Sequence, residues 1–285
     1  MVSPVKLIEC PRDAMQGWPD FIPTAQKIEY LNALLHVGFD TLDFGSFVSP
    51  KAIPQLRDTA DVLEGLKLEN VSTKLLAIVA NLRGAQEAAA FPKIRYLGYP
   101  FSISETFQQR NTNASIAESL QRVEEIVELC AGNNKEPVIY ISMGFGNPYG
   151  DAWNPDIVIH WVKKLADMGI RIIALADTVG VSTPESIRHL FSALIPECHT
   201  VELGAHLHTH PDTWKEKVEA AWESGCRRFD SAFNGIGGCP MADDRLVGNM
   251  ATEALIAHFG GPAAVGLHAD AIPEALRIAG RIFHT

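Results

Sequence analysis

Residues 171–195 read RIIALADTVGVSTPESIRHLFSALI, a stretch that contains one complete strand, loop and helix pattern. The run Arg171–Asp177 is rich in branched apolar residues, which favours a buried strand. A helix is predicted over Thr183–Leu194, because Pro184 stands in its first turn, where proline is favoured. A buried strand followed by an amphipathic helix is the repeating unit of a parallel sheet.

The same alternation recurs along the whole chain, and eight strand and helix pairs can be counted. The predicted strands are Val5–Cys10, Thr41–Phe47, Lys74–Ala80, Lys93–Phe101, Pro137–Phe145, Arg171–Asp177, Val201–His208 and Arg227–Phe233. Eight pairs fit one closed barrel better than two open sheets, so we predict an α/β fold that is a single (β/α)8 TIM barrel. No linker rich in proline, glycine or serine divides the chain, and we therefore predict one domain over residues 1–285.

Several predicted helices carry recognisable end signals. Thr24–Val37 has apolar residues at the spacing of one buried face, and Gly38 stands where a C-terminal cap belongs. Ser115 and Glu118 have capping-box spacing at the start of a helix that runs through Cys130. The remaining predicted helices of this kind, each followed by glycine, are Asn154–Met168 and Pro211–Ser224.

The length and composition exclude several classes of protein. The 285 residues suit one α/β barrel, and a hydrophobic fraction of 47% excludes a disordered chain. Asp and Glu outnumber Lys and Arg by 34 to 24, a net charge of −10, which argues against a nucleic-acid partner. Because no signal peptide and no apolar run of ~18 residues is found, we expect a cytoplasmic protein with no membrane partner.

The five cysteines are an odd number, widely scattered and without C-x-x-C spacing. Neither a disulfide framework nor a structural zinc site is therefore predicted. Cys239 differs from the others because it lies in the glycine-rich stretch 234–242, which we expect to form a loop over the site. Its thiol is a candidate to donate or accept a proton, or else a small residue that fills a turn.

Side chains at the C-terminal ends of the strands face the active site of such a barrel. Just beyond the first strand lie Arg12 and Asp13, which are either a functional pair or a structural ion pair. His206 and His208 are two residues apart on a strand, so their side chains point the same way. They suit one metal ion, among Mg²⁺, Mn²⁺, Fe²⁺ and Zn²⁺, or else they form a hydrogen-bonding pair.

Five more polar residues stand near strand ends or in the last loop. Asn249 is a candidate to offer its carbonyl oxygen to a metal, or else to cap the following helix. Asp43 and Ser46 are candidates to orient the nearby arginine or a substrate oxygen. Ser104 and Asp177 stand at the ends of the fourth and sixth strands, where a loop-capping role is the default for small polar residues.

Taken together, these segments resemble the 3-hydroxy-3-methylglutaryl-CoA lyase family, which belongs to a wider group of divalent-metal TIM-barrel enzymes. The resemblance covers nearly the whole chain. It rests on ECPRDAMQ (9–16), SFVSPKAIPQL (46–56), SISETFQQRNTNASIAESLQR (102–122), ADTVGVSTP (176–184), AHLH (205–208), GGCPMA (237–242) and GNMATE (248–253).

The resemblance implies cleavage of a 3-hydroxyacyl-CoA, in the namesake case 3-hydroxy-3-methylglutaryl-CoA, to acetyl-CoA and acetoacetate. It implies a divalent cation, Mg²⁺ or Mn²⁺, with Asp13, His206, His208 and Asn249 as its ligands. An acyl-CoA partner and a homodimer are implied as well.

The resemblance also assigns roles in catalysis. Arg12 is predicted to stabilise the developing enolate oxygen, with Asp43 in contact with it. His206 or a neighbouring carboxylate is predicted to accept the alcohol proton, and Cys239 to reprotonate the acetyl-CoA carbanion. The residues predicted to contact substrate are Ser46, Ser104 and Asp177.

Some positions depart from the family pattern. Asp43 stands where a Glu is usual, Asn147 replaces a common cysteine, and Thr209 follows His208 in place of an Asp. Three alternatives therefore stay open. They are a lyase for a related thioester such as citramalyl-CoA, a barrel that binds acyl-CoA or metal without turnover, and a condensing synthase, which is disfavoured because those enzymes continue into further C-terminal domains.

Overall fold

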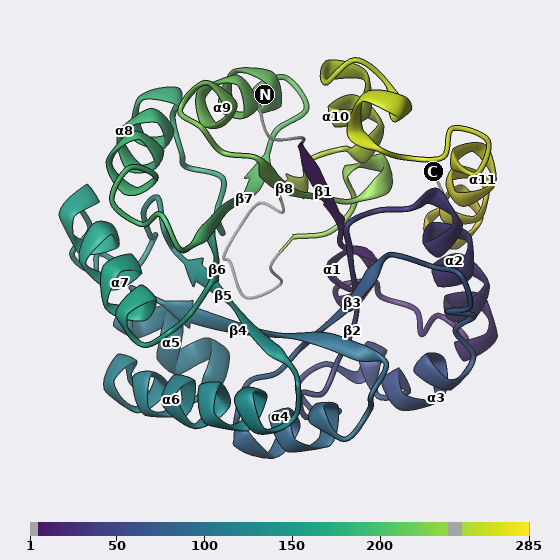
Figure 1. Ribbon diagram of the computed structural model, residues 1–285, viewed down its shortest axis with the longest axis horizontal. Helices are drawn as coiled ribbons and strands as arrows, with labels where there is room; N and C mark the ends of the chain where they lie inside the picture. Colours follow the sequence, from purple (N-terminus) through teal and green to yellow (C-terminus); the bar gives the residue numbers. More distant parts are fainter. Residues whose placement is uncertain (1–4, 239–246, 285) are drawn as a thin grey trace.

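The computed structural model describes residues 5–238 and 247–284. Eight parallel strands form a closed barrel, because the neighbours run β6, β5, β4, β3, β2, β1, β8 and β7, and β6 also pairs with β7 (Figure 1). They are β1 (Lys6–Glu9), β2 (Thr41–Ser46), β3 (Lys74–Ile78), β4 (Ile94–Ser102), β5 (Glu136–Ser142), β6 (Ile172–Asp177), β7 (Glu202–Thr209) and β8 (Arg228–Ser231). The predicted TIM barrel is confirmed.

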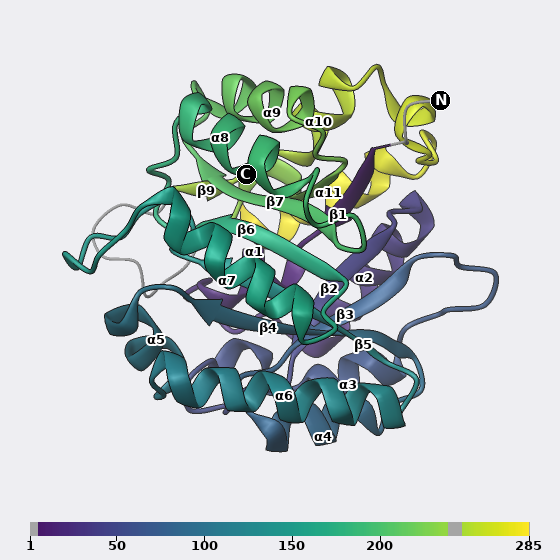
Figure 2. The ribbon, with the colours of Figure 1, turned by 60° about the vertical axis from the view of Figure 1, so that its left-hand side comes forward.

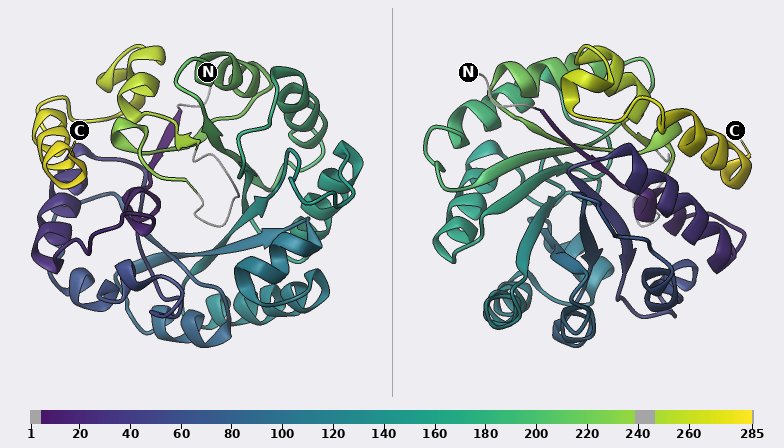
Figure 3. Two further views of the ribbon diagram at one scale, coloured as in Figure 1. Left: turned by 180° about the vertical axis from the view of Figure 1, so that it is seen from behind. Right: turned by 45° about the vertical axis from the view of Figure 1, so that its right-hand side comes forward.

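The helices surround the barrel. They are α1 (Pro11–Gln16), α2 (Thr24–Val37), α3 (Thr59–Glu64), α4 (Leu82–Ala89), α5 (Glu105–Thr112), α6 (Ile116–Gly132), α7 (Pro155–Asp167), α8 (Pro184–Leu194), α9 (Trp214–Glu223), α10 (Thr252–His258) and α11 (Ile272–Phe283), with short 3₁₀ turns η1 (Pro54–Leu56), η2 (Phe233–Gly235) and η3 (Pro262–Val265). Figure 2 shows α6 along the outside of β4 and β5. The two views of Figure 3 show α11 beside α2, so the ends of the chain complete the ring of helices. None of the helices described is long and apolar enough to cross a membrane.

The helix ends form for the local reasons that the sequence indicated. Ser115 and Glu118 make a capping box at the start of α6, and Gly38 ends α2 with a φ of +89°. The predicted helix Pro211–Ser224 is wrong at its start, because residues 211–213 form a turn closed by the Thr213 N–H donating to the His210 carbonyl. The predicted strand bounds agree with the observed ones to within three residues.

Two elements that the sequence did not predict shape the active end of the barrel. Directly after β1 the chain turns into α1, a six-residue helix that lies inside the ring of outer helices (Figure 1). The two-residue strand β9 (Gly248–Asn249) pairs antiparallel with β7, so that Asn249 lies opposite His208. Both elements hold side chains at the C-terminal ends of the barrel strands.

A buried carboxyl group ties the start of α10 to the barrel. Glu9 is fully buried and accepts hydrogen bonds from the Phe233 backbone N–H at 2.8 Å and from the Thr252 hydroxyl at 2.5 Å. Burial raises the pKa of Glu9 to about 8, and these two hydrogen bonds offset only part of that rise. At neutral pH the folded protein therefore keeps a proton on Glu9 that the unfolded chain releases.

We expect a Glu9→Gln substitution to change how stability depends on pH. The stabilisation from the proton on Glu9 is complete below the ordinary pKa of 4.5 and is lost as pH rises to about 8. The wild-type free energy of unfolding should therefore fall relative to that of the variant by up to about 1.4 kcal/mol per pH unit in this range. Urea unfolding of both proteins across this range measures the difference, and two parallel curves would show that Glu9 is ionised in the folded state.

Candidate active site

A cavity of about 490 Å³ opens at the C-terminal ends of the barrel strands. Tyr140 and Ser142 line it from β5, and His206 and His208 line it from β7. Arg12, Asp13 and Gln16 reach it from α1, and Val48 and Ile78 form part of an apolar wall. Cationic, carboxylate and imidazole groups thus share one concave site with apolar surface, as is typical of sites for small molecules.

The two histidines of β7 face each other at the floor of this cavity. Their Nε2 atoms are 3.2 Å apart, and both side chains are buried. The opposite ring nitrogens have separate partners. His206 Nδ1 lies 3.0 Å from Asp230 Oδ2, and His208 Nδ1 lies 3.0 Å from the Thr178 carbonyl oxygen. Since both partners are acceptors, each Nδ1 carries a proton when it makes these bonds.

This arrangement leaves two bare nitrogen lone pairs in contact. A neutral imidazole has one N–H group, so the Nε2 atoms of His206 and His208 are both acceptors when both Nδ1 atoms donate. Two buried acceptors at 3.2 Å repel each other unless a cation lies between them. The donor set therefore fits a metal ion.

The two rings differ in how readily they take up a proton. Burial lowers the pKa of His208, and the nearby His206 lowers it further, so His208 stays neutral and able to coordinate. Burial also lowers the pKa of His206, but the hydrogen bond and charge of Asp230 outweigh burial and raise it above the ordinary value. A proton on His206 would satisfy the same contact that a metal ion satisfies.

Asp13 adds a carboxylate to the pair of imidazoles. Its Oδ2 lies 3.8 Å from His208 Nε2, and ligand atoms of Asp13, His206 and His208 all lie within 4.8 Å of one another. Burial would raise the pKa of Asp13, but the charge of Arg12, with smaller effects of both histidines, lowers it to about 2. Asp13 is thus an anion at neutral pH, as a metal ligand must be.

The fourth predicted ligand lies beside Asp13. The Asn249 Nδ2 donates to Asp13 Oδ2 at 2.7 Å and to the Ile236 carbonyl at 2.9 Å, so that Oδ1 is the atom of this side chain that could bind a metal ion. It does not cap α10, whose N-cap is Ala251 without a side-chain cap bond. Gly237, at a φ of +109°, allows this close approach, because a Cβ there would lie 2.5 Å from Asn249 Nδ2.

Arg12 is held by a pair of carboxylates. Its Nε and Nη2 donate to Asp43 Oδ2 at 2.9 and 2.6 Å, and its Nη1 donates to Asp13 Oδ1 at 3.0 Å and to Gln16 Oε1 at 2.9 Å. Of the five N–H groups of the guanidinium, these bonds leave one on Nη2. Burial raises the pKa of Asp43 to about 6, although the charge of Arg12 opposes this. The Arg12–Asp43 contact expected from the sequence is present.

The three residues predicted to contact substrate have hydrogen-bond partners within the protein. Ser46 donates to the Ile78 carbonyl, Ser104 caps α5 and bonds Asp151, and Asp177 accepts from Ser182 and Lys217. None of the three is among the cavity-lining residues of the described chain. The default loop-capping role describes Ser104 and Asp177 well. Cys239 lies outside the described residues.

Other residues of the site were not singled out from the sequence. Gln16 donates to Asp13 Oδ1 at 2.8 Å, one helical turn along α1, and Tyr140 packs edge-on against His206. Thr178 and Asp230 fix the two imidazole rings. The positions of Tyr140 and Thr178 near strand ends were a usable signal. Asp230 had a weaker one, since a carboxylate inside a predicted buried strand needs a partner.

Comparisons with known proteins give a consistent result. The HMGL-like family model matches residues 5–274. The mitochondrial hydroxymethylglutaryl-CoA lyase of Bos taurus is 35% identical over 271 residues, which cover 93% of this chain and 80% of the relative. The cytoplasmic 3-hydroxy-3-methylglutaryl-CoA lyase of Homo sapiens is 34% identical over 90% of this chain and 69% of its own length.

Solved structures of bacterial lyases superpose on the whole barrel. Hydroxymethylglutaryl-CoA lyase from Pseudomonas aeruginosa has a TM-score of 0.90 at 31% identity, covering 99% of this chain and 94% of that one. An HMG-CoA lyase from Acinetobacter baumannii, in complex with coenzyme A and 3-methylmalate, has a TM-score of 0.87 at 31% identity, covering 98% and 91%.

Proposed function

The chain belongs to the HMGL-like family, and we propose that it is a lyase that cleaves 3-hydroxy-3-methylglutaryl-CoA to acetyl-CoA and acetoacetate. The observation that carries this proposal is the convergence of Arg12 with the two imidazoles and Asp13 at one cavity floor. Breaking a carbon–carbon bond next to a tertiary alcohol requires groups that polarise the alcohol and a cation that holds the enolate. Both kinds of group are present.

We assign a divalent cation, Mg²⁺ or Mn²⁺, to Asp13, His206, His208 and Asn249. The chemistry that such a cation supplies when bound is Lewis acidity, which lowers the pKa of the substrate hydroxyl and fixes its orientation. Two oxygen and two nitrogen donors suit these borderline or hard ions, because no thiolate is in the set. Asp13 also links this set to the enolate-binding side, since its other oxygen accepts from Arg12.

Arg12 stabilises the enolate oxygen of the departing acetyl-CoA. Its remaining Nη2 hydrogen is the donor for that oxygen, while Asp43 and Gln16 hold the guanidinium in place. A guanidinium stays protonated throughout the reaction, so it stabilises negative charge without giving up its proton. Its position is set before the substrate binds, which is how such groups contribute most to a rate.

The two roles predicted for His206 compete for one atom. Its Nδ1 is engaged by Asp230, so Nε2 is the atom available both to a metal and to the alcohol proton. The facing Nε2 atoms favour the ligand role, which leaves a neighbouring carboxylate to accept the alcohol proton. Cys239 is proposed, from the sequence alone, to return a proton to the acetyl-CoA carbanion.

The acyl-CoA substrate is supported by the Acinetobacter baumannii structure, which contains coenzyme A. A homodimer is proposed on the family resemblance. A cytoplasmic location is proposed on the sequence alone, and the named relatives include both mitochondrial and cytoplasmic proteins.

A related thioester is the second candidate substrate, because the ligand of that same neighbour is 3-methylmalate, a branched hydroxy diacid. The values of kcat/KM for 3-hydroxy-3-methylglutaryl-CoA and for citramalyl-CoA decide between the two. We expect the first to be preferred by tenfold or more, the effect of about 1.4 kcal/mol in the transition state. A preference for citramalyl-CoA would retain the reaction and change the substrate.

A further inference from the structure

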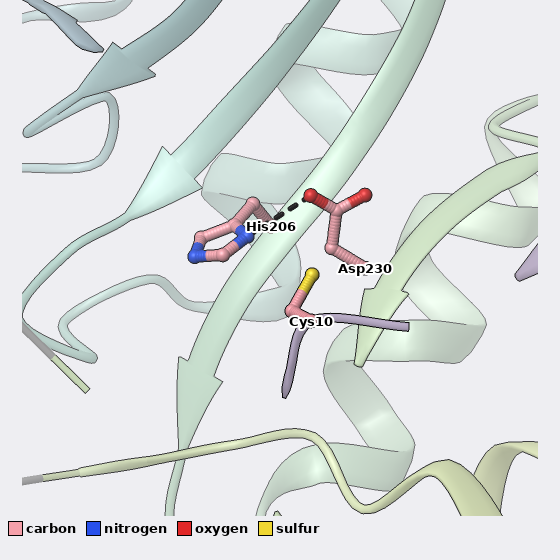
Figure 4. A group of neighbouring side chains, drawn as sticks. All are labelled: Cys10, His206 and Asp230. Carbon is pink, nitrogen blue, oxygen red and sulfur yellow. Dashed lines mark hydrogen bonds and ion pairs between the residues drawn. The ribbon is translucent and has the colours of Figure 1, made fainter. Parts of the chain in front are cut away.

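A second group of ligand atoms lies directly beneath the cavity floor. Cys10 directly after β1, His206 on β7 and Asp230 on β8 each offer one ligand atom, and these atoms lie within 4.8 Å of one another. Figure 4 shows the Cys10 sulfur pointing toward the Asp230 carboxylate, next to the His206 ring. All three residues are buried, with Cys10 and Asp230 at 0% and 1% exposure.

Two polar atoms of this group have few hydrogen-bond contacts among the described residues. Asp230 Oδ1 is buried without a hydrogen-bond partner within the part of the chain that is described. The Cys10 thiol has one weak contact, 3.7 Å to the Ile8 carbonyl. The negative charges of Asp230, Asp43 and Asp13 act on Cys10, and the positive charge of Arg12 offsets only part of them. A buried thiol among carboxylates is a poor place for an additional anion and a favourable one for a cation.

His206 belongs to both groups through different ring nitrogens. We call Asp13, His206, His208 and Asn249 the upper set, and Cys10, His206 and Asp230 the lower site. With the proton on His206 Nδ1, the Nε2 lone pair faces His208 and Asp13, and the upper set can bind a metal. With the proton on Nε2, that N–H donates to His208 Nε2 at 3.2 Å, and the Nδ1 lone pair faces Cys10 and Asp230. One imidazole proton can occupy only one nitrogen, so the neutral ring serves one set at a time.

We propose that Cys10, His206 and Asp230 form a second metal site, selective for a thiophilic divalent cation such as Zn²⁺ or Cd²⁺, and that its occupation excludes the cation bound by the upper set. A thiolate, an imidazole and a carboxylate are ligands of Zn²⁺, whereas Mg²⁺ and Mn²⁺ disfavour sulfur. The exclusion rests on His206 being a ligand in the proposed function, but the existence of the lower site does not.

Binding of a divalent cation to these three residues involves proton transfer but no oxidation or reduction. The S–H bond of Cys10 breaks, its proton leaves to solvent, and a sulfur–metal bond forms. The ring proton of His206 moves from Nδ1 to Nε2. Thiolate and carboxylate together neutralise the divalent charge, which removes most of the cost of burying the ion.

Titration of the full-length protein with Cd²⁺ tests the site, because a cadmium–thiolate bond gives an ultraviolet charge-transfer band. We expect a saturable band in the wild type that Cys10→Ser abolishes. Cys226→Ser is a matched control, since Cys226 is equally buried and bonds backbone carbonyls, and Cys239→Ser tests the cysteine of the glycine-rich stretch. A band that survives in Cys10→Ser, or is lost in Cys239→Ser, would overturn the assignment.

Two further measurements need no substitution. X-ray absorption at the zinc edge of the wild type should show one sulfur at about 2.3 Å. Added Mn²⁺ should raise the Cd²⁺ concentration at half-saturation of the band linearly with free Mn²⁺, doubling it when free Mn²⁺ equals its own dissociation constant. Zinc without sulfur would refute the site even if Cys10→Ser fails to fold. If the Cd²⁺ concentration at half-saturation does not change when Mn²⁺ is added, the two sites do not exclude each other. Neither result depends on which thioester the protein cleaves.

Discussion

Replacing Arg12 by Gln should lower kcat for 3-hydroxy-3-methylglutaryl-CoA by about a hundred- to a thousandfold, the usual cost of losing one preorganised group that stabilises an oxyanion. The neutral amide cannot offer a permanent positive charge to the enolate oxygen. Because the enolate exists only after the bond has begun to break, kcat should fall much more than KM changes.

The same variant should still bind Mn²⁺. Asp13 keeps its hydrogen bonds from Gln16 and Asn249 when Arg12 is removed, so its position among the ligands does not depend on the guanidinium alone. Arg12→Lys is the matched control, because it keeps a charge but loses the two-point contact with Asp43. It should recover only part of the lost rate. Near-normal turnover in Arg12→Gln would rule out the enolate role.

Replacing His208 by Ala should abolish tight metal binding and, with it, turnover. His208 Nε2 is the atom that faces both His206 Nε2 and Asp13 Oδ2, at 3.2 and 3.8 Å. Without it, one of the two nitrogen donors is missing, and the dissociation constant for Mn²⁺ should rise by about a hundredfold or more, above the 10–100-fold that the loss of an outer hydrogen-bond partner costs. Electron paramagnetic resonance of free Mn²⁺ measures this directly.

Thermal unfolding gives an independent check on the same variant. Mn²⁺ should raise the Tm of the wild type, since an ion that binds only the folded state stabilises it. It should leave the Tm of His208→Ala unchanged. His210→Ala is the matched control, because His210 is exposed, two residues further along the chain, and should respond as the wild type does. An equal rise in His208→Ala would place the metal elsewhere.

The pairing of the two histidines could be predicted because it depends only on the two-residue period of a strand. The strand itself was clear from its apolar residues, and residues at i and i+2 then share a face. Their position at the active end of the barrel followed from counting eight strands. Local periodicity was sufficient for these features.

The placement of Arg12 and Asp13 was only half predictable. The sequence put them at the end of the first strand, but the six residues of α1 are too few for a periodic signal. That turn of helix is what directs Arg12 toward Asp43 and brings Gln16 next to Asp13. Asn249 depends on β9, a two-residue strand that pairs with β7 from 41 positions away, and no local pattern indicates such a pairing.

Polar residues at strand ends were harder to sort. Ser46, Ser104 and Asp177 have the residue types and positions of substrate contacts, but their side chains form hydrogen bonds with neighbouring strand and loop residues. Asp230 shows the opposite case, because it lies within a strand and yet orients His206. Whether a polar group is used locally or at the site depends on tertiary contacts that the sequence does not specify.

The central claim is that this cavity cleaves a carbon–carbon bond with the help of a divalent cation, and product analysis tests it most directly. The protein is incubated with 3-hydroxy-3-methylglutaryl-CoA and Mg²⁺ or Mn²⁺, after chelation, and after the metal is restored. The account predicts equal amounts of acetyl-CoA and acetoacetate, loss of both on chelation, and recovery on addition of metal. Unchanged turnover in the chelated protein, or no cleavage of any 3-hydroxyacyl-CoA by a protein that binds metal tightly, would contradict it.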